Sequence, residues 1–204
     1  MQARVEPNCS RGLPVATRFA KRDIGADTFD AISSIGMFEH VGFEQLDEYF
    51  SVLLRRLRPG GRLLNHGIAR PKPGGRPDRH SFVNRYIFPD AELREVGEVI
   101  AAMERGGFEV RDLECLREHY GRTLRAWVAG LQASWEQAVT AVGERRALIW
   151  LVYLAGCAVS FERGDTTVHQ ILAVRRDHGR SHLLASRQEL LGWQPPENAV
   201  SAPV

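Results

Sequence analysis

The sequence predicts an α/β fold in which a parallel sheet carries helices on its faces. Two apolar runs, Phe29–Ile35 and residues 62–68, have the pattern of buried strands, and apolar residues recur at helical spacing between them. Pro59, Gly60 and Gly61 end that helix before the second run begins. Strand, helix and strand in this order form a βαβ crossover, which pairs two parallel strands and lays the helix on one face of their sheet.

The helices of the first part of the chain follow from apolar spacing and from glycine. The helix of the crossover is predicted at residues 43–58. A second helix is predicted at 92–105, where Gly106 and Gly107 close it. Between the crossover and this helix, residues 70–79 are rich in Pro, Gly and Arg, which predicts a surface loop.

The last elements complete one half of a doubly wound sheet. Residues 108–116 predict a strand, and residues 117–161 predict two long helices broken near Gly143. Residues 166–176 alternate apolar and polar side chains and predict the last strand. A doubly wound sheet has two halves that flank a ligand-binding switch point. Only the second half is recognisable in this sequence.

Composition and charge favour one globular domain between two irregular ends. The chain has 204 residues, of which 44% are hydrophobic and 25% charged. Its net charge of +2 provides no strong field for nucleic acid, so we expect no nucleic-acid partner. The three cysteines are far apart, which favours a reducing cytoplasm and predicts no metal site. We predict an irregular segment at 1–28, the folded domain at 29–176 and a largely disordered tail at 177–204.

Several motifs in this domain resemble one enzyme family. Residues 29–42, FDAISSIGMFEHVG, resemble the FDxIxSIGMFEHVG signature of the cyclopropane-fatty-acyl-phospholipid synthases. The LRPGG turn at 57–61, FVNRYIFPD at 82–90, LREHY at 116–120 and YLAGCA at 153–158 are also similar to landmarks of this family, and they occur in the family's order. The resemblance covers residues 29–176 and implies that the chain corresponds to the C-terminal portion of such an enzyme.

The resemblance implies a fold and an activity. The fold would be the Rossmann-like fold of class I S-adenosylmethionine (SAM)-dependent methyltransferases, with an inserted helical segment that covers an acyl chain. The reaction would transfer a methylene group from SAM to a cis double bond of a phospholipid acyl chain, as part of lipid biosynthesis. The implied location is the cytoplasm, with peripheral contact at the membrane surface, where the acyl chains are the partners.

The resemblance also implies the catalytic residues. In this family a bound bicarbonate ion acts as the base, and Glu39, His66, Ile68 and Tyr153 match the residues that hold it. The physics of the sequence agrees, because Glu39 and His66 follow neighbouring strands and α/β sheets place their sites at such ends. An anion in an apolar cavity needs hydrogen-bond donors, which His66 and Tyr153 supply. One of the two acids, Glu39 or the ion, should hold a proton, since like charges at short range disfavour double ionisation.

The cofactor contacts are the incomplete part of the resemblance. Ser34, Ile35 and Gly36 match family positions near SAM, but residues 1–28 contain no Gly-x-Gly element of the kind that holds the cofactor. The N-terminal cofactor-binding half is therefore expected to be missing, which predicts weak SAM binding by this chain. A half-sheet exposes an edge and an apolar face, so we also expect either a homo-oligomer or a need for the missing segment.

Other interpretations of the same residues stay open. A Glu and a His after strands are commonly a cap and a core residue, and Cys157 has the character of a small buried apolar residue. At the level of function, the alternatives are a related SAM-dependent methyltransferase that acts on lipids or small molecules, and a non-catalytic remnant.

Overall fold

A computed structural model describes residues 28–71, 81–89 and 92–183. Most of the predicted N-terminal segment, of the predicted loop at 70–79 and of the predicted tail lies outside the described residues; the described start of the tail carries a bridge between Asp177 and Arg180. The elements in chain order are β1 (Phe29–Ile35), the 3-10 turns Phe38–His40 and Phe43–Gln45, α2 (Leu46–Arg56), β2 (Leu57–Arg70), α3 (Phe82–Tyr86), β3 (Arg94–Glu95), α4 (Val96–Arg105), β4 (Glu109–Cys115), α5 (Arg117–Ala133), α6 (Trp135–Val142), α7 (Glu144–Arg163) and β5 (Thr167–Val174).

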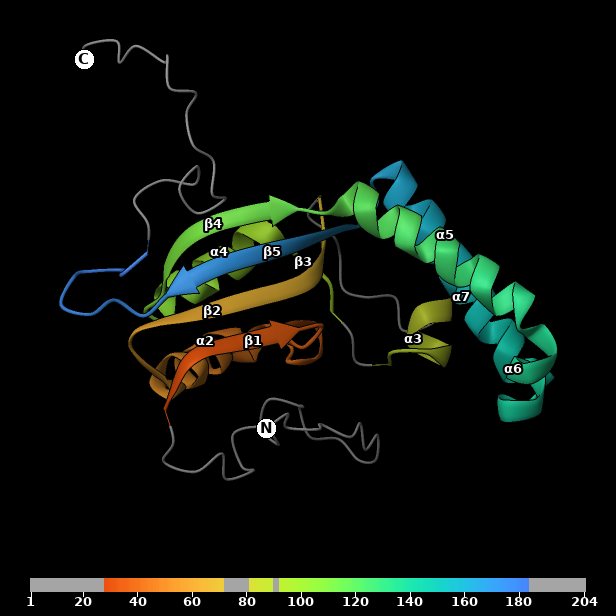
Figure 1. The fold of residues 1–204 in the computed structure, drawn as a ribbon, viewed down its shortest axis with the longest axis horizontal. Coiled ribbons are helices and arrows are strands. Elements are labelled where there is room, and N and C mark those ends of the chain that lie inside the picture. The colour runs from red at the N-terminus through yellow and green to blue at the C-terminus, as the bar shows by residue number, and fades with distance from the viewer. Residues whose placement is uncertain (1–27, 72–80, 90–91, 184–204) are drawn as a thin grey trace, which may run out of the picture.

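The strands form one mixed sheet in the order β1-β2-β5-β4, and the short β3 pairs with β2 (Figure 1). β1 and β2 are parallel, which confirms the predicted βαβ crossover through α2. β5 runs antiparallel to both β2 and β4. Because β3 pairs with Ala69 and Arg70, it continues on the edge of β2 where β1 has ended. The functional side chains lie around this end of the sheet.

Helices α2 and α4 cover one face of the sheet, behind it in Figure 1. Alternation along β2 turns Leu63 into this core, where Phe50 of α2 and Met103 of α4 are fully buried. Gly67 lies on the same face and the Phe38 ring packs directly on it, since a Cβ there would lie 2.0 Å from Phe38 Cε1. Only glycine fits at this position, and it fixes the turn that carries Glu39.

The opposite face of β1 is open in the described part of the chain. Residues at alternate positions of β1 are exposed, including Phe29 and Ile35, whose side chain is 67% exposed. This agrees with the expected exposed face of a half-sheet. No helix of the described residues is long and apolar enough to cross a membrane.

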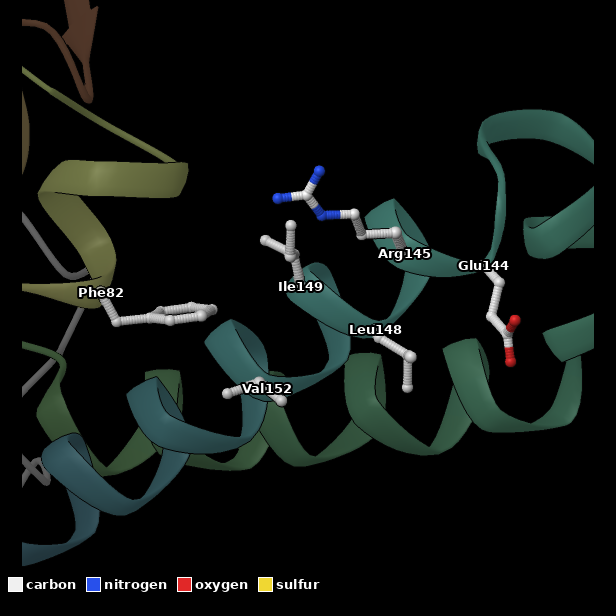
Figure 2. A pocket seen from close by; sticks show the side chains of 6 residues that line it. All are labelled: Phe82, Glu144, Arg145, Leu148, Ile149 and Val152. Atoms are coloured by element: carbon white, nitrogen blue, oxygen red, sulfur yellow. The ribbon is translucent and has the colours of Figure 1, made fainter.

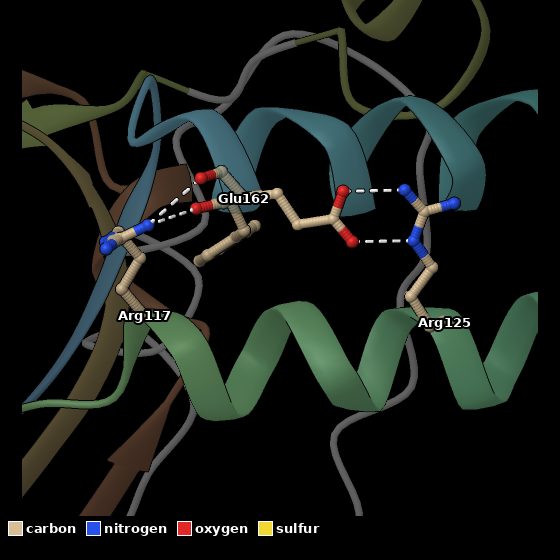
Figure 3. Close-up of polar contacts among 4 residues, drawn as sticks. Arg117, Arg125 and Glu162 are labelled. Carbon is tan, nitrogen blue, oxygen red and sulfur yellow. Dashed lines mark hydrogen bonds and ion pairs between the residues drawn. The ribbon is translucent and has the colours of Figure 1, made fainter.

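Helices α5, α6 and α7, called the helical arm below, extend beyond the end of the sheet (Figure 1). A second, smaller apolar cluster joins the arm to the sheet through Leu124, Phe161 and Val168. Polar contacts hold α5 against α7: an Arg117 guanidinium nitrogen donates to the Phe161 carbonyl over 2.8 Å, and Arg125 forms a bidentate pair with Glu162 at 2.6 Å (Figure 3).

The predicted bounds of the first helix and of the strand that follows it were wrong. The first helix starts at Leu46 after a 3-10 turn, and it ends at Arg56 because Leu57 already pairs with Phe29 of β1. The Pro-Gly-Gly turn is part of β2, because the Gly60 N–H donates to Arg175 O over 2.7 Å and Gly61 O accepts from Arg175 N at 2.9 Å.

The remaining differences concern the helices after β2. The region 117–161 holds three helices rather than two, because Ser134 interrupts the first long helix before the predicted break at Gly143. The second predicted helix begins at Val96, since Arg94 and Glu95 pair with β2 as β3. The short helix α3, capped by the Ser81 hydroxyl, was not predicted.

Candidate active site

Glu39 lies in the turn that directly follows β1 and is 5% exposed. Its Oε1 accepts a hydrogen bond from the Ile68 backbone N–H at 2.7 Å. β1 has ended at this level of the sheet, so the carboxylate takes the place of a strand carbonyl against the edge of β2. Two of the four predicted catalytic residues, Glu39 and Ile68, are thus in direct contact, and the contact uses the backbone of Ile68 rather than its side chain.

The second oxygen of Glu39 has no partner among the described residues. Oε2 is buried and forms no hydrogen bond there. Burial raises the pKa of Glu39, and the hydrogen bonds from the backbone N–H groups of Ile68 and of Glu39 itself oppose that rise. A carboxyl group in this environment can hold a proton at higher pH than an exposed one and present it to, or accept it from, a neighbouring group.

His66 lies on the edge of β2 at the level where β1 ends, because Gly36 N donates to His66 O at 2.9 Å. The side chain is half-buried, and Nδ1 is buried without a hydrogen-bond partner among the described residues. Burial lowers the pKa of His66, so the ring is neutral near pH 7 and keeps one donor and one acceptor nitrogen. No hydrogen bond of the described residues joins His66 to Glu39 or to Tyr153.

Tyr153 comes from α7, and its ring packs edge-on against Phe88 at 5.9 Å and against Trp150 at 5.6 Å between centroids. The Cys157 thiol comes one helical turn later and lies near enough to the Tyr153 hydroxyl to raise its pKa. Burial raises the pKa of both groups. The Cys157 side chain is half-buried against the apolar cluster of Leu124, Phe161 and Val168, as its predicted apolar character implies, and its thiol also lies near the Tyr153 hydroxyl.

Tyr120 is a further member of the site that the sequence analysis did not single out as a site residue. It lies on α5, where its ring packs against Phe161 at 4.9 Å and against Trp127 at 5.9 Å. Burial raises the pKa of Tyr120, and the nearby negative forms of Cys157 and Glu39 raise it further. The negative form of Tyr120 in turn raises the pKa of Tyr153. The Tyr120 hydroxyl is thus within electrostatic range of Glu39 at the end of the sheet and of Tyr153 and Cys157 on α7.

The three predicted cofactor residues differ in orientation. Ser34 is buried on the α2 face, with its Oγ 2.5 Å from the Tyr49 hydroxyl. Ile35 points to the open face, and Gly36 turns the chain with a φ of 60°. Ile35 and Gly36 are accessible to a ligand above the open face, whereas the Ser34 hydroxyl is used inside the core. Among the described residues, no group of three or more His, Cys, Asp or Glu side chains could hold a metal ion.

Comparison with known families identifies this arrangement. The model of the mycolic acid cyclopropane synthetase family matches residues 18–171, about three quarters of the chain. The chain belongs to this family. The match includes all the predicted site residues, from Ser34 to Tyr153.

Curated relatives share the family at substantial identity. A probable fatty acid methyltransferase of Pseudomonas putida is 42% identical over 158 residues, which cover 76% of this chain and 40% of the relative. The cyclopropane-fatty-acyl-phospholipid synthase of Escherichia coli K12 is 35% identical over 154 residues, or 76% of this chain and 39% of that enzyme. The chain thus spans about two fifths of the length of these family members.

A solved structure shows that the fold is also that of the family. A mycolic acid cyclopropane synthase in complex with SAH and CTAB superposes with a TM-score of 0.67 at 33% identity. The superposition covers 74% of this chain and 57% of that enzyme. The predicted fold, a part of the SAM-dependent methyltransferase fold, is therefore confirmed.

Proposed function

We propose that this chain carries the acid–base part of a cyclopropane-fatty-acyl-phospholipid synthase, which transfers a methylene group from SAM to a cis double bond of an acyl chain. The observation that carries the proposal is the state of Glu39. One carboxylate oxygen is fixed by the Ile68 N–H, and the other is buried without a partner among the described residues. SAM would supply the new carbon as its sulfonium methyl group.

Forming a ring from a methyl group requires that a proton leave the transferred carbon. A base that removes it must lie in an apolar environment, where water cannot compete for the reactive carbon. Glu39 is buried, and the rise in its pKa favours the protonated form, which can donate a hydrogen bond from Oε2 to a base bound beside it. The hydrogen bond to Ile68 holds the carboxyl group in one orientation.

The predicted set of donors suits a small anion such as bicarbonate. His66 offers a buried nitrogen without a hydrogen-bond partner in the described part of the chain, and Tyr153 offers a phenol whose raised pKa keeps it protonated. Glu39, His66 and Tyr153 would hold the ion, and Ile68 would act through the backbone N–H that orients Glu39. Bound there, bicarbonate would act as the proton acceptor, and a protonated Glu39 would hydrogen-bond to it rather than repel it.

The apolar surroundings favour a hydrocarbon substrate. A row of aromatic contacts leads from the surface to the turn of Glu39: Trp150 packs on Tyr153, Tyr153 on Phe88, and Phe88 on His40 at 5.3 Å. Trp150 at the outer end is exposed, and His40 at the inner end is the neighbour of Glu39. An acyl chain can lie against such rings, which offer large contact area without an unpaired charge.

The test is transfer of label from methyl-labelled SAM to vesicles of cis-unsaturated phospholipid. Because weak SAM binding is expected, calorimetry first sets a saturating SAM concentration. Glu39→Gln and His66→Ala should abolish ring formation, followed by the cyclopropane protons of the product lipid, while circular dichroism shows a folded chain. A folded wild-type chain that transfers no label at saturating SAM would contradict the proposal and favour a non-catalytic remnant.

Tyr153→Phe is the finer variant, since it removes one hydroxyl and keeps the ring contacts with Phe88 and Trp150. The loss of one charge-assisted hydrogen bond to the anion is worth about 1.5–3 kcal/mol. The rate should therefore fall roughly ten- to a hundredfold, and added bicarbonate should restore part of it. An unchanged rate would show that Tyr153 serves packing alone.

A second candidate function is methylation of a fatty acyl chain without ring closure. It is favoured by the relative that is 42% identical, whose name is probable fatty acid methyltransferase. A ring adds the same mass as a methyl branch formed when the intermediate cation loses a neighbouring proton and keeps a double bond, so proton NMR of the product lipid must separate them. Cyclopropane methylene protons resonate at higher field than any methyl branch. A methyl-branched product would replace the first candidate by the second.

A further inference from the structure

Exposed apolar side chains are concentrated on α3 and the helical arm. Eleven large hydrophobic residues are exposed in the described part of the chain, and only Phe29 and Ile35 of them lie on the sheet. The densest group lies where α3 meets the first turns of α7: Phe82 is 37% exposed, Tyr86 and Trp150 are 42% exposed, Leu148 is 45% and Val152 is 55% exposed. A contiguous patch of this kind marks an interaction site more often than isolated exposed residues do.

Two neighbouring hollows lie along the first turns of α7 within this patch. One open hollow of about 330 Å³ lies between Phe82 and α7, and Figure 2 shows the Phe82 ring directed toward Ile149 and Val152. A second hollow of about 540 Å³ lies beside Tyr86 and Trp150. Both hollows share Glu144, Arg145 and Ile149. Apolar side chains beside more basic than acidic groups suit a partner with hydrocarbon chains below a negatively charged layer.

The charge of the patch is basic. Arg145 and Arg146 lie in the first turn of α7, where the helix dipole disfavours cations, so their position costs helix stability. They and Arg85 of α3 form no ion pair within the described residues, whereas most other arginines there do. Glu144 is the acidic residue that lines the hollows. Three exposed guanidinium groups without an ion pair in the described part of the chain therefore lie beside aromatic and aliphatic side chains, and that of Arg85 lies 5.4 Å from the centroid of the Tyr86 ring.

We infer that this α3–α7 surface, formed by the apolar residues and arginines just named, docks on a bilayer that contains acidic phospholipid. Trp150 and Tyr86 would lie at the level of the headgroups, where their rings reach hydrocarbon and their polar atoms reach water. Leu148 and Val152 would enter the acyl region, and the arginines would bind phosphate. The inference rests on the proposed function in one respect: the aromatic row that starts at Trp150 would lead an acyl chain toward Glu39.

Charge argues against a second copy of the chain as the occupant. A two-fold dimer through this surface would bring two equivalent patches together, each with three arginines and one lining acidic residue, Glu144. Such an arrangement places like charges in a partly apolar contact. An acidic lipid layer neutralises the same charges.

The experiment is cosedimentation of the full chain with sucrose-loaded vesicles of phosphatidylcholine, with and without phosphatidylglycerol. Binding should require phosphatidylglycerol and should weaken at high salt. Each arginine near an acidic surface contributes about fivefold in partition, so Arg145→Ala with Arg146→Ala should weaken binding roughly 25-fold. Arg62→Ala with Arg111→Ala removes the same charge from exposed positions on the sheet and should leave binding nearly unchanged.

Brominated lipid locates the surface independently of charge. Quenching of tryptophan fluorescence by brominated acyl chains should be lost in Trp150→Phe and kept in Trp127→Phe, which changes an exposed tryptophan elsewhere on the arm. Equal binding to both vesicle types, or quenching that persists in Trp150→Phe, would overturn the inference. Self-association that Val152→Asp abolishes in sedimentation analysis would assign the surface to a second copy instead.

These outcomes are independent of catalysis. A chain that binds vesicles through Trp150 without transferring label would retain the docking surface and reject the proposed function. A chain that transfers label to acyl lipid in detergent micelles but does not bind acidic vesicles would retain the proposed function and reject the docking surface.

Discussion

The region beneath the sheet and the helical arm differ in how many buried residues hold each of them in place. Fourteen buried residues, including Phe50, Leu63 and Met103, form one cluster between the sheet and α2 and α4. The arm is joined to the sheet by a cluster of four, Leu124, Ala158, Phe161 and Val168, and exposes much of its apolar surface. The large cluster makes the region beneath the sheet rigid. The arm contributes polar side chains to the site and apolar side chains to its surroundings.

This difference divides the candidate site into two parts. Glu39 and Ile68 belong to the rigid end of the sheet, where a backbone hydrogen bond fixes the carboxyl group. Tyr120, Tyr153 and Cys157 belong to the arm. Substitutions in the sheet core should therefore reduce stability, whereas those in the arm should affect function with little effect on stability.

The largest expected effect is on Phe50, which is 0% exposed and packs edge-on against Tyr49 and Phe108. Phe50→Ala should lower the free energy of unfolding by about 3–5 kcal/mol, measured by urea denaturation. Leu148→Ala on the arm should change it by about 0.5 kcal/mol or less, since that side chain is largely exposed. Similar losses for both variants would contradict the division.

A glycine pair tests the same contrast at smaller magnitude. Gly67→Ala places a methyl group against the Phe38 ring and should cost about 1–3 kcal/mol, because neither the strand nor the buried ring can move freely. Gly156→Ala on α7 meets nothing within 4 Å and should stabilise the chain by roughly 0.5–1 kcal/mol. Urea denaturation of the two variants should therefore give shifts of opposite sign.

Glu39 should show a smaller, pH-dependent effect. Its pKa is raised by burial, so the folded chain binds a proton more tightly than the unfolded chain, and stability falls as pH rises above the unfolded value of 4.5. Glu39→Gln keeps an oxygen for the Ile68 N–H and removes the ionisation. The variant should gain melting temperature relative to wild type as pH rises from 4.5 toward neutrality. A difference that is constant with pH would show that Glu39 does not titrate in this window.

The sequence identified the elements whose apolar residues follow a clear periodicity or whose end is marked by glycine or proline. β1 was predicted at its observed bounds because a continuous apolar run ends at a glycine with positive φ. The helix α3 was missed because five residues are too short for a helical period. The break at Ser134 was missed because no glycine or proline marks it. The extension of β2 through Gly60 depends on pairing with Arg175, which lies far away in sequence.

The site shows the same limit. The family motif identified Glu39, and its position after β1 agreed with the rule for strand ends. Its hydrogen bond to Ile68 depends on β2 extending beyond β1, which is a property of the sheet rather than of either sequence segment. The Tyr153–Cys157 contact could have been found from their four-residue spacing on a helix. Tyr120 ends the LREHY motif, but the motif does not show which way its side chain points, and α5 packs it against Phe161 through tertiary contacts.

The central claim is that Glu39 is a buried carboxyl group with a raised affinity for a proton. Infrared difference spectroscopy between pH 4 and 8, with Glu39→Gln subtracted from wild type, follows the carbonyl stretch of the protonated form of this residue alone. The account predicts that the band persists above pH 4.5 and disappears at higher pH than the bands of exposed glutamates. A Glu39 band that disappears at or below pH 4.5 would contradict the account.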